Sequence, residues 1–301
     1  MFDASGATKR LASCHDVRVA QETALSTIDG YTIVDVPEAE RLVGPIRTAK
    51  KVLQRTTLDL VRHATYACAV HGLNAAGAAA ALNHDRASED QSPIAAFAEE
   101  LATWAEACSF VGSVGLGIGA EEAGPVLSVS AERAEASSIA SASACARGGA
   151  SVIVVSGSEE AALVSALGDV TVEVQDDPKA ALQAGVDVVM VRGKTGVLDH
   201  EVLADTNAKL VIGLQPLTVT ARGLAVASRA GAIVVPDFIS AAGPALAALG
   251  NDPTQVREMT TDAVGALTGH GVDLFVAACE RAEAHLRTIT ETLPFGRPLA
   301  P

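Results

Sequence analysis

The second half of the chain alternates short β-branched runs with helical patterns, and this alternation constrains the fold more than any other feature. The runs are apolar on both faces, and glycines such as Gly148 and Gly231 end the helical segments between them. Strands of this kind belong to a parallel sheet whose two faces are covered by helices. The sequence therefore predicts a Rossmann-like domain over residues 126–269, with strands at 151–155, 170–174, 186–191, 209–214 and 232–235.

The first half has the pattern of a mixed α/β domain. Valines at 17 and 19 alternate with polar residues, and Asp29-Gly30 is a hairpin turn signal before an apolar run at 31–36, so both stretches are predicted strands. Two helices follow them. Thr56-x-x-Asp59 has the pattern of a capping box, and Ser92-Pro93 has that of an N-cap followed by proline.

The chain closes with further helical patterns. Asp252-Pro253 is another N-cap pair, and apolar residues recur at heptad-like spacing from Val272 to Ile289. That stripe has to be buried, most simply by packing back onto the first domain. The first domain is therefore expected to comprise residues 1–125 plus 270–301, which makes the whole an α/β protein of two domains.

Composition and spacing exclude several functions. The net charge is −14 and the cations are scattered, so no basic stripe for a nucleic acid is expected. No apolar run is long enough to span a membrane, and the first ten residues lack a secretion-signal pattern. The five cysteines have no CxxC spacing, which favours buried free thiols in a reducing compartment, the cytoplasm. The seven histidines show no HxxxH or HExxH spacing, so no metal site is expected.

Two segments of the second half carry a resemblance to a known family. Residues 209–216 read Lys-Leu-Val-Ile-Gly-Leu-Gln-Pro, and residues 230–244 contain Pro236-Asp237 followed by Phe-Ile-Ser-Ala-Ala-Gly-Pro. In order and spacing they resemble the glutamate/leucine/phenylalanine/valine dehydrogenase family, in which a strand ending in Gly-Ala-Asn precedes a helix and a strand ending in Pro-Asp. In the first half, residues 64–73 with Gly77 are similar to that family's substrate helix and glycine-rich catalytic loop. The likeness covers about residues 42–243.

The resemblance implies oxidative deamination, in which a hydride passes from the α-carbon of an amino acid to a nicotinamide. The family's catalytic lysine then falls on Ala79, its carboxylate-binding lysine on Ala67 and its proton-transferring aspartate on Gly117. The loss of the lysines does not depend on the alignment, because no lysine stands between Lys51 and Lys179. Each such role typically contributes about 10²–10⁴-fold in rate. The family's catalytic groups are therefore expected to be missing.

The nicotinamide site is expected to be lost too, so no NAD(P) is expected to bind. In the family a Gly-x-Gly-x-x-Gly turn lets backbone N–H groups reach the cofactor pyrophosphate. By resemblance these glycines fall on Ala131, Arg133 and Ala136, and the acidic residue that holds the ribose falls on Ser156. Glutamates beside Arg133 would also repel the pyrophosphate, since like unit charges 4 Å apart cost about 4 kcal/mol at an effective dielectric of 20.

Other candidates have both a functional and a structural interpretation. His71, His84 and Asp85 flank the catalytic-loop region and are the best acid–base candidates, although lone histidines are more often surface or core residues. For the rest the structural interpretation is favoured: Lys50 and Lys51 as solvated, Asp237 as a helix cap, His63 and Cys68 as packed, residues 115–119 as a hinge, Ser156 and Ser158 as caps.

Two functions remain open. The favoured one is a catalytically inactive homologue with a binding, regulatory or structural role, as a homo-oligomer or as a hetero-oligomer with a related dehydrogenase. The strands around Val17 and 31–36 are expected at the open edge of the first domain, where a neighbouring subunit would cover them. The alternative is a functional NAD(P)-dependent amino-acid dehydrogenase with relocated catalytic groups.

Overall fold

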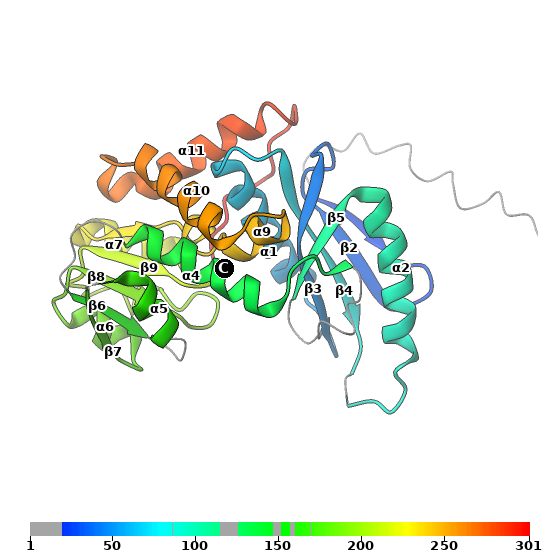
Figure 1. The fold of residues 1–301 in the computed structure, drawn as a ribbon, viewed down its shortest axis with the longest axis horizontal. Coiled ribbons are helices and arrows are strands. Elements are labelled where there is room, and N and C mark those ends of the chain that lie inside the picture. The colour runs from blue at the N-terminus through cyan, green and yellow to red at the C-terminus, as the bar shows by residue number, and fades with distance from the viewer. Residues whose placement is uncertain (1–19, 86, 115–125, 147–151, 157–159, 169) are drawn as a thin grey trace, which may run out of the picture.

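The structure is a computed structural model that describes residues 20–85, 87–114, 126–146, 152–156, 160–168 and 170–301. Two lobes, each built on a five-stranded sheet, lie side by side (Figure 1). One sheet is formed within residues 21–114 and the other within residues 152–235. The predicted α/β architecture, a mixed lobe followed by a Rossmann-like parallel lobe, is confirmed.

The first sheet has the strand order β1-β2-β4-β3-β5. Its strands are β1 Gln21–Ala24, β2 Gly30–Val34, β3 Arg41–Ala49, β4 Ala75–Asn83 and β5 Phe110–Val114. β2 pairs antiparallel with β1 and β4, whereas β3 pairs parallel with β4 and β5. The helices α1 (Gln54–Val70) and α2 (Ser92–Cys108) lie on opposite faces of this sheet (Figure 1). β4 is therefore enclosed on all sides.

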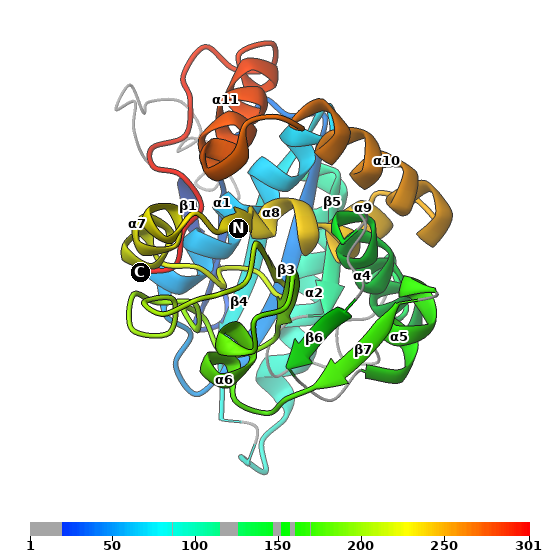
Figure 2. The same cartoon turned by 90° about the vertical axis from the view of Figure 1, so that its left-hand side faces the viewer.

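The second sheet is fully parallel, with the order β10-β9-β8-β6-β7. Its strands are β6 Val152–Ser156, β7 Thr171–Val174, β8 Val188–Val191, β9 Leu210–Gly213 and β10 Ile233–Val235. All five predicted strands are present at the expected places. The helices that connect them are α5 Glu160–Leu167, α6 Pro178–Gln183 and α7 Ala221–Ala230 (Figure 2). Gly231 ends α7 in the left-handed conformation at φ 77°, as its position predicted.

Five further helices complete the described part of the fold, and three of them contact elements of the first lobe. The five helices are α4 Ala131–Cys145, α8 Asp237–Ser240, α9 Gly243–Ala248, α10 Pro253–Ala266 and α11 Leu274–Leu286. α4 packs on α9 and α10, and α9 also contacts β3 and β5 of the first sheet. A single buried cluster runs from Leu42 of the first sheet to Ile212 of the second. The two lobes therefore share one hydrophobic core.

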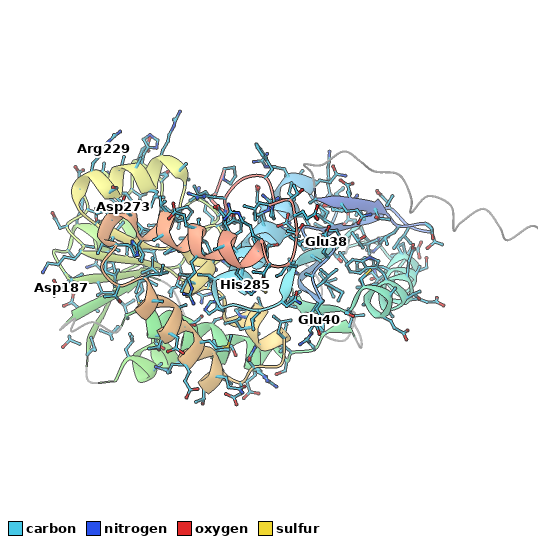
Figure 3. All side chains as sticks on the ribbon, turned by 90° about the horizontal axis from the view of Figure 1, so that it is seen from above. Glu38, Glu40, Asp187, Arg229, Asp273 and His285 are labelled. Atoms are coloured by element: carbon cyan, nitrogen blue, oxygen red, sulfur yellow. The ribbon has the colours of Figure 1, made fainter. Side chains whose placement is uncertain are left out.

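The C-terminal helix returns to the first lobe, as predicted. α11 buries Phe275, Cys279, Ala282 and Leu286 and packs against α1 and β10. Seen from above, it lies across both lobes, with Asp273 at its second-lobe end and His285 at its first-lobe end (Figure 3). His285 Nε2 lies 3.0 Å from Leu73 O, which fixes that end of the helix to the first lobe.

Several local predictions are wrong. α1 begins two residues before Thr56 without a side-chain cap, and Asp59 pairs instead with Arg55 one turn earlier. Ser92 lies inside α2 and does not cap it, although the adjacent proline is at its start. Residues 31–34 belong to β2, which is an interior strand; the open edge is β1, all four residues of which are exposed. The predicted strand around Val17 lies outside the described residues.

The Asp252-Pro253 prediction is confirmed. The Asp252 carboxylate accepts hydrogen bonds from Thr254 N and Gln255 N, and the Gln255 side chain accepts one from Asp252 N in return. Cys68, Cys145 and Cys279 are buried free thiols, also as expected, and Cys108 is a partly exposed one. Among the described residues, no helix is both long and apolar enough to cross a membrane.

Candidate functional site

The positions that the resemblance assigns to the two lysines lie in the core of the first lobe. Ala79 is on β4, opposite Ile33 of β2, and is 0% exposed. It belongs to a buried cluster with Tyr31, Ile33, Val52 and Val61. Ala67 is on α1 and is likewise 0% exposed. A polar group at either position would have to be buried; Gly117 lies outside the described residues.

The backbones of α1 and β4 touch directly beside Ala79. A Cβ placed on Gly77 would lie 1.8 Å from Val61 O, so only glycine permits this approach. Gly77 N donates a hydrogen bond of 2.9 Å to Thr65 Oγ1, which in turn donates to Val61 O at 3.1 Å. Helix and strand are thus in contact at the place where the family resemblance puts a catalytic loop.

A buried ion pair lies on the neighbouring part of α1. Arg62 donates from Nε and Nη2 to the Asp35 carboxylate at 2.7–3.0 Å. Its Nη1 donates to Phe295 O and, at 2.8 Å, to Gly296 O, both in the C-terminal segment. The Arg62 and Asp35 side chains are 8% and 0% exposed. The guanidinium therefore has partners on both sides.

A second buried pair joins the lobes. His63 Nε2, on α1, lies 3.4 Å from Asp237 Oδ1 at the start of α8. Asp237 Oδ2 accepts a hydrogen bond of 2.6 Å from Thr218 N, on the loop after β9. Asp237 makes no side-chain cap, so the capping prediction for it is wrong. Neither His63 Nε2 nor Asp237 Oδ1 has a hydrogen-bond partner among the described residues, and the two residues are only 4% and 1% exposed.

The predicted acid–base candidates are not brought together. His71 precedes β4 and His84 follows it, so the two histidines lie at opposite ends of a nine-residue strand that is about 27 Å long. Burial lowers the pKa of His71 to about 4, against the effect of its hydrogen bond to Ala67 O, so its imidazole is neutral at pH 7. Asp85 is at the surface, where Ala87 N–H and then Lys50 lower its carboxyl pKa. These residues form no catalytic constellation.

Of the other structural interpretations, some agree with the structure and some concern residues that it does not describe. Lys50 and Lys51 are exposed, and His63 and Cys68 are buried, as expected. Residues 115–119 and Ser158 lie outside the described residues. Within the described part of the chain, no three His, Cys, Asp or Glu side chains are grouped so that they could hold a metal ion.

The topology of the second lobe shows that the glycine turn was predicted at the wrong place in the sequence. Ala131, Arg133 and Ala136 lie on α4, which is capped by Ser130 and follows none of the strands of the second sheet. Arg133 Nη2 donates to Gly250 O and Asn251 O at 2.9 and 3.0 Å, so it connects α4 to the loop before α10. These three positions do not form a strand–turn–helix unit, and the assignment of the turn to them is corrected.

The first strand of the second sheet that is followed by a helix is β6, which precedes α5; the residues between them, 157–159, lie outside the described part of the chain. Ser156 ends β6 itself, so it belongs to the first strand and not to the next one. The sequence of this segment, Ser156-Gly-Ser-Glu-Glu-Ala161, contains one glycine where the dinucleotide fingerprint has three. In the sequence, residues 155–158 stand between a strand pattern and a helix pattern, and this feature could have located the segment.

The position that corresponds to the ribose-binding residue of dinucleotide-binding folds therefore also differs from the predicted Ser156. In dinucleotide-binding folds an acidic residue about 20 residues after the turn holds the ribose. Here Asp176 and Asp177 follow β7 at that distance. Both aspartates are exposed, and Asp177 accepts a hydrogen bond of 3.0 Å from Lys179 N and caps α6.

No family model and no curated protein matches the sequence. Solved structures do match. L-tryptophan dehydrogenase from Nostoc punctiforme superposes with a TM-score of 0.70 at 14% identity, over 91% of this chain and 97% of that one. Hetero-hexameric glutamate dehydrogenase from Thermus thermophilus, in its Leu-bound form, gives 0.69 at 17% identity, over 91% and 89%. The chain has the amino-acid dehydrogenase fold.

Other glutamate dehydrogenases agree with this assignment. The enzyme from Peptoniphilus asaccharolyticus has a TM-score of 0.66 at 12% identity, over 90% of this chain and 91% of that one. Both lobes of the dehydrogenase fold are therefore present at nearly full length.

Proposed function

We propose that this chain is a catalytically inactive homologue of the amino-acid dehydrogenases that serves as a binding or assembly subunit. The observation that carries the proposal is the burial of Ala67 and Ala79, both 0% exposed in closely packed surroundings. A dehydrogenase needs a cationic group that reaches a substrate carboxylate and a second that activates water, and methyl groups in a core do neither. The approach of α1 to β4 at Gly77 supports the proposal, because helix and strand are in direct contact there.

The proposal includes the absence of NAD(P) binding. The sequence from the end of β6 into α5 has a single glycine, Gly157, followed by Glu159 and Glu160, and Glu160 is the first residue of α5. Backbone N–H groups reach a pyrophosphate only where side chains leave room, and carboxylates at that helix end oppose the phosphate charge. Calorimetric titration and a thermal-shift screen with nicotinamide cofactors and amino acids test this. We expect dissociation constants above about 100 μM, weaker than about −5.5 kcal/mol; tighter binding contradicts it.

The assembly role rests on the edge of the first sheet and on one structural neighbour. β1 is an edge strand whose four residues are exposed, and such an edge is commonly covered by another subunit. The Thermus glutamate dehydrogenase is a hetero-hexamer. We therefore propose a cytoplasmic homo-oligomer, or a hetero-oligomer with an active relative, with no nucleic-acid or membrane partner.

Light scattering tests the assembly proposal at 10–100 μM protein, where dimers of micromolar affinity form. A mass that is a multiple of the 30.5 kDa chain is expected. A monomer over this whole range contradicts the homo-oligomer. For the hetero-oligomer, we expect the chain to co-purify with a dehydrogenase relative from the native cells. If no such relative co-purifies, the hetero-oligomer proposal is contradicted.

The alternative is a working NAD(P)-dependent amino-acid dehydrogenase with relocated groups, and the His63–Asp237 pair is the observation in its favour. A buried imidazole beside a carboxylate is the arrangement of a general base with its orienting group. His63 is, however, only 4% exposed, so a substrate would reach it only if the lobes separated. Amino-acid-dependent activity that is lost in His63→Gln would favour this alternative.

A further inference from the structure

The chain after α11, residues 287–301 and here called the tail, passes from one lobe to the other. It leaves α11, runs beside α1 and ends next to α7 (Figure 2). We infer that the tail is a strap that holds the two lobes at one fixed angle. The inference does not depend on the proposed function, since it concerns only how the lobes are connected.

The first-lobe attachment is polar. Arg62 on α1 donates to the carbonyl oxygens of Phe295 and Gly296, and Asp35 holds the other side of the same guanidinium. Arg297 donates to both oxygens of Glu283 at 2.8 and 3.2 Å, and Tyr66 OH donates to Glu283 Oε1 at 3.2 Å. A charge-assisted network thus ties the tail to α1 and α11.

The second-lobe attachment is made by the backbone and by apolar packing. Ala300 N donates a hydrogen bond of 2.9 Å to Val219 O, and Ala300 forms a parallel bridge with Thr220. Thr220 N in turn donates to Leu198 O, so the end of the tail adds to a small parallel ladder after β8 and β9. Pro298 and Ala300 are buried, and Leu299 packs against the cluster shared by the two lobes and against a second buried cluster that includes Leu198 and Val219.

The two attachments are close together along the chain. Three residues separate Gly296 from Ala300, so their Cα atoms are at most about 14 Å apart even in a fully extended chain. One of the three is Pro298, whose fixed φ reduces this freedom further. Two-lobed α/β proteins commonly close and open about a hinge. In this chain such a motion has to break the attachment at Arg62 or the one at Val219.

Distances between spin labels on the two lobes test the strap. Glu106→Cys on α2 and Lys179→Cys on α6 place labels at exposed positions, in a Cys14→Ser, Cys108→Ser background. Cys68, Cys145 and Cys279 stay unlabelled because they are buried, and burial raises each of their thiol pKa values to about 12. The wild-type tail should give one narrow distance distribution.

Two tail variants and one control complete the design. Ala300→Pro removes the N–H that donates to Val219 O, and truncation after Arg297 removes the whole second-lobe attachment. Both should widen the distribution by about twofold or more and raise amide exchange at Leu198 and Thr220 about tenfold. Phe295→Ser is the matched control, since that side chain is 76% exposed and only its carbonyl takes part.

An unchanged, narrow distribution in Ala300→Pro, with cooperative unfolding retained, overturns the strap. If the truncated chain does not fold, Ala300→Pro decides the matter alone. Widening in Phe295→Ser to the same extent also overturns it, because the effect would then not come from the attachments. None of these readouts involves a cofactor or an amino acid, so they separate this inference from the proposed function.

Discussion

At the scale of single residues, the junction between the lobes is held by buried polar groups whose partners come from distant parts of the sequence. Arg62 pairs with Asp35 and with backbone carbonyls more than 230 residues later, and His63 faces Asp237 from another lobe. Removing one member of such a pair leaves the other uncompensated in a region of low dielectric, which costs far more than the pair contributes.

The Arg62–Asp35 pair gives a stability prediction. Asp35→Ala should lower the free energy of unfolding by about 3–5 kcal/mol, because it leaves a buried guanidinium without its counter-charge. The double variant Asp35→Leu with Arg62→Met should lose less, since no charge remains to be desolvated. Denaturant unfolding measures both. A double variant that is less stable than Asp35→Ala would contradict this view of the pair.

His71 gives a pH prediction. Burial lowers its pKa from 6.5 to about 4, so the folded protein excludes a proton that the unfolded chain binds. The residue is partly exposed, but its Nε2 is buried. The contribution of neutral His71 to the free energy of unfolding is fully present above about pH 6.5. It is lost as the pH falls toward 4, because the unfolded chain binds the proton first, and the loss is up to about 3 kcal/mol in total.

His71→Gln should therefore flatten the decline of unfolding free energy between pH 6.5 and 4, and His270→Gln, at an exposed position, should leave it as in the wild type. Denaturant titrations at four or five pH values give the comparison. Equal slopes in the wild type and in His71→Gln would show that the imidazole is not buried in the way described.

At the scale of elements, the second sheet could be predicted and the centre of the first could not. Parallel strands that are buried on both faces are continuous apolar runs, and β8, with four buried residues, has that pattern. β4 is mostly alanine, which has no preference for strands, and it is extended because β2 and β3 pair with it on either side. Only tertiary context makes it a strand.

Part of the candidate site could likewise be predicted from the sequence, and part of it could not. The identity of the groups at positions 67 and 79 could be argued from the sequence, because no lysine is available anywhere nearby. The glycine turn was misplaced onto α4, since the helical pattern after Ser130 does not reveal that no sheet strand precedes it. The His63–Asp237 contact could not be foreseen, because it joins two elements 174 residues apart that pack only in the complete fold.

Ala79→Lys tests whether β4 retains an open site. The new ammonium would be buried among Tyr31, Ile33, Val52 and Val61, so we expect several kcal/mol of destabilisation. Ala79→Met adds similar bulk without charge and should cost about 1–3 kcal/mol. Neither variant should form NADH, because catalytic groups that act as a unit are not restored singly. A lysine variant as stable as the methionine variant, or an active one, would show that the position is accessible.

At the scale of the whole molecule, the chain keeps the architecture of a dehydrogenase while its two lobes are joined by one core, by α11 and by the tail. An enzyme of this kind closes and opens around its substrates, whereas a binding or assembly subunit gains from a fixed shape. The shared core, the buried alanines and the doubly attached tail all agree with the second role.

The most direct test of this account is the absorbance at 340 nm when the purified protein is mixed with NAD⁺ or NADP⁺ and glutamate, leucine, phenylalanine, valine or tryptophan. We expect no increase above the protein-free rate with any combination, even at micromolar protein, because Ala67 and Ala79 cannot replace the two lysines. An increase that depends on the amino acid and rises in proportion to protein concentration would contradict it.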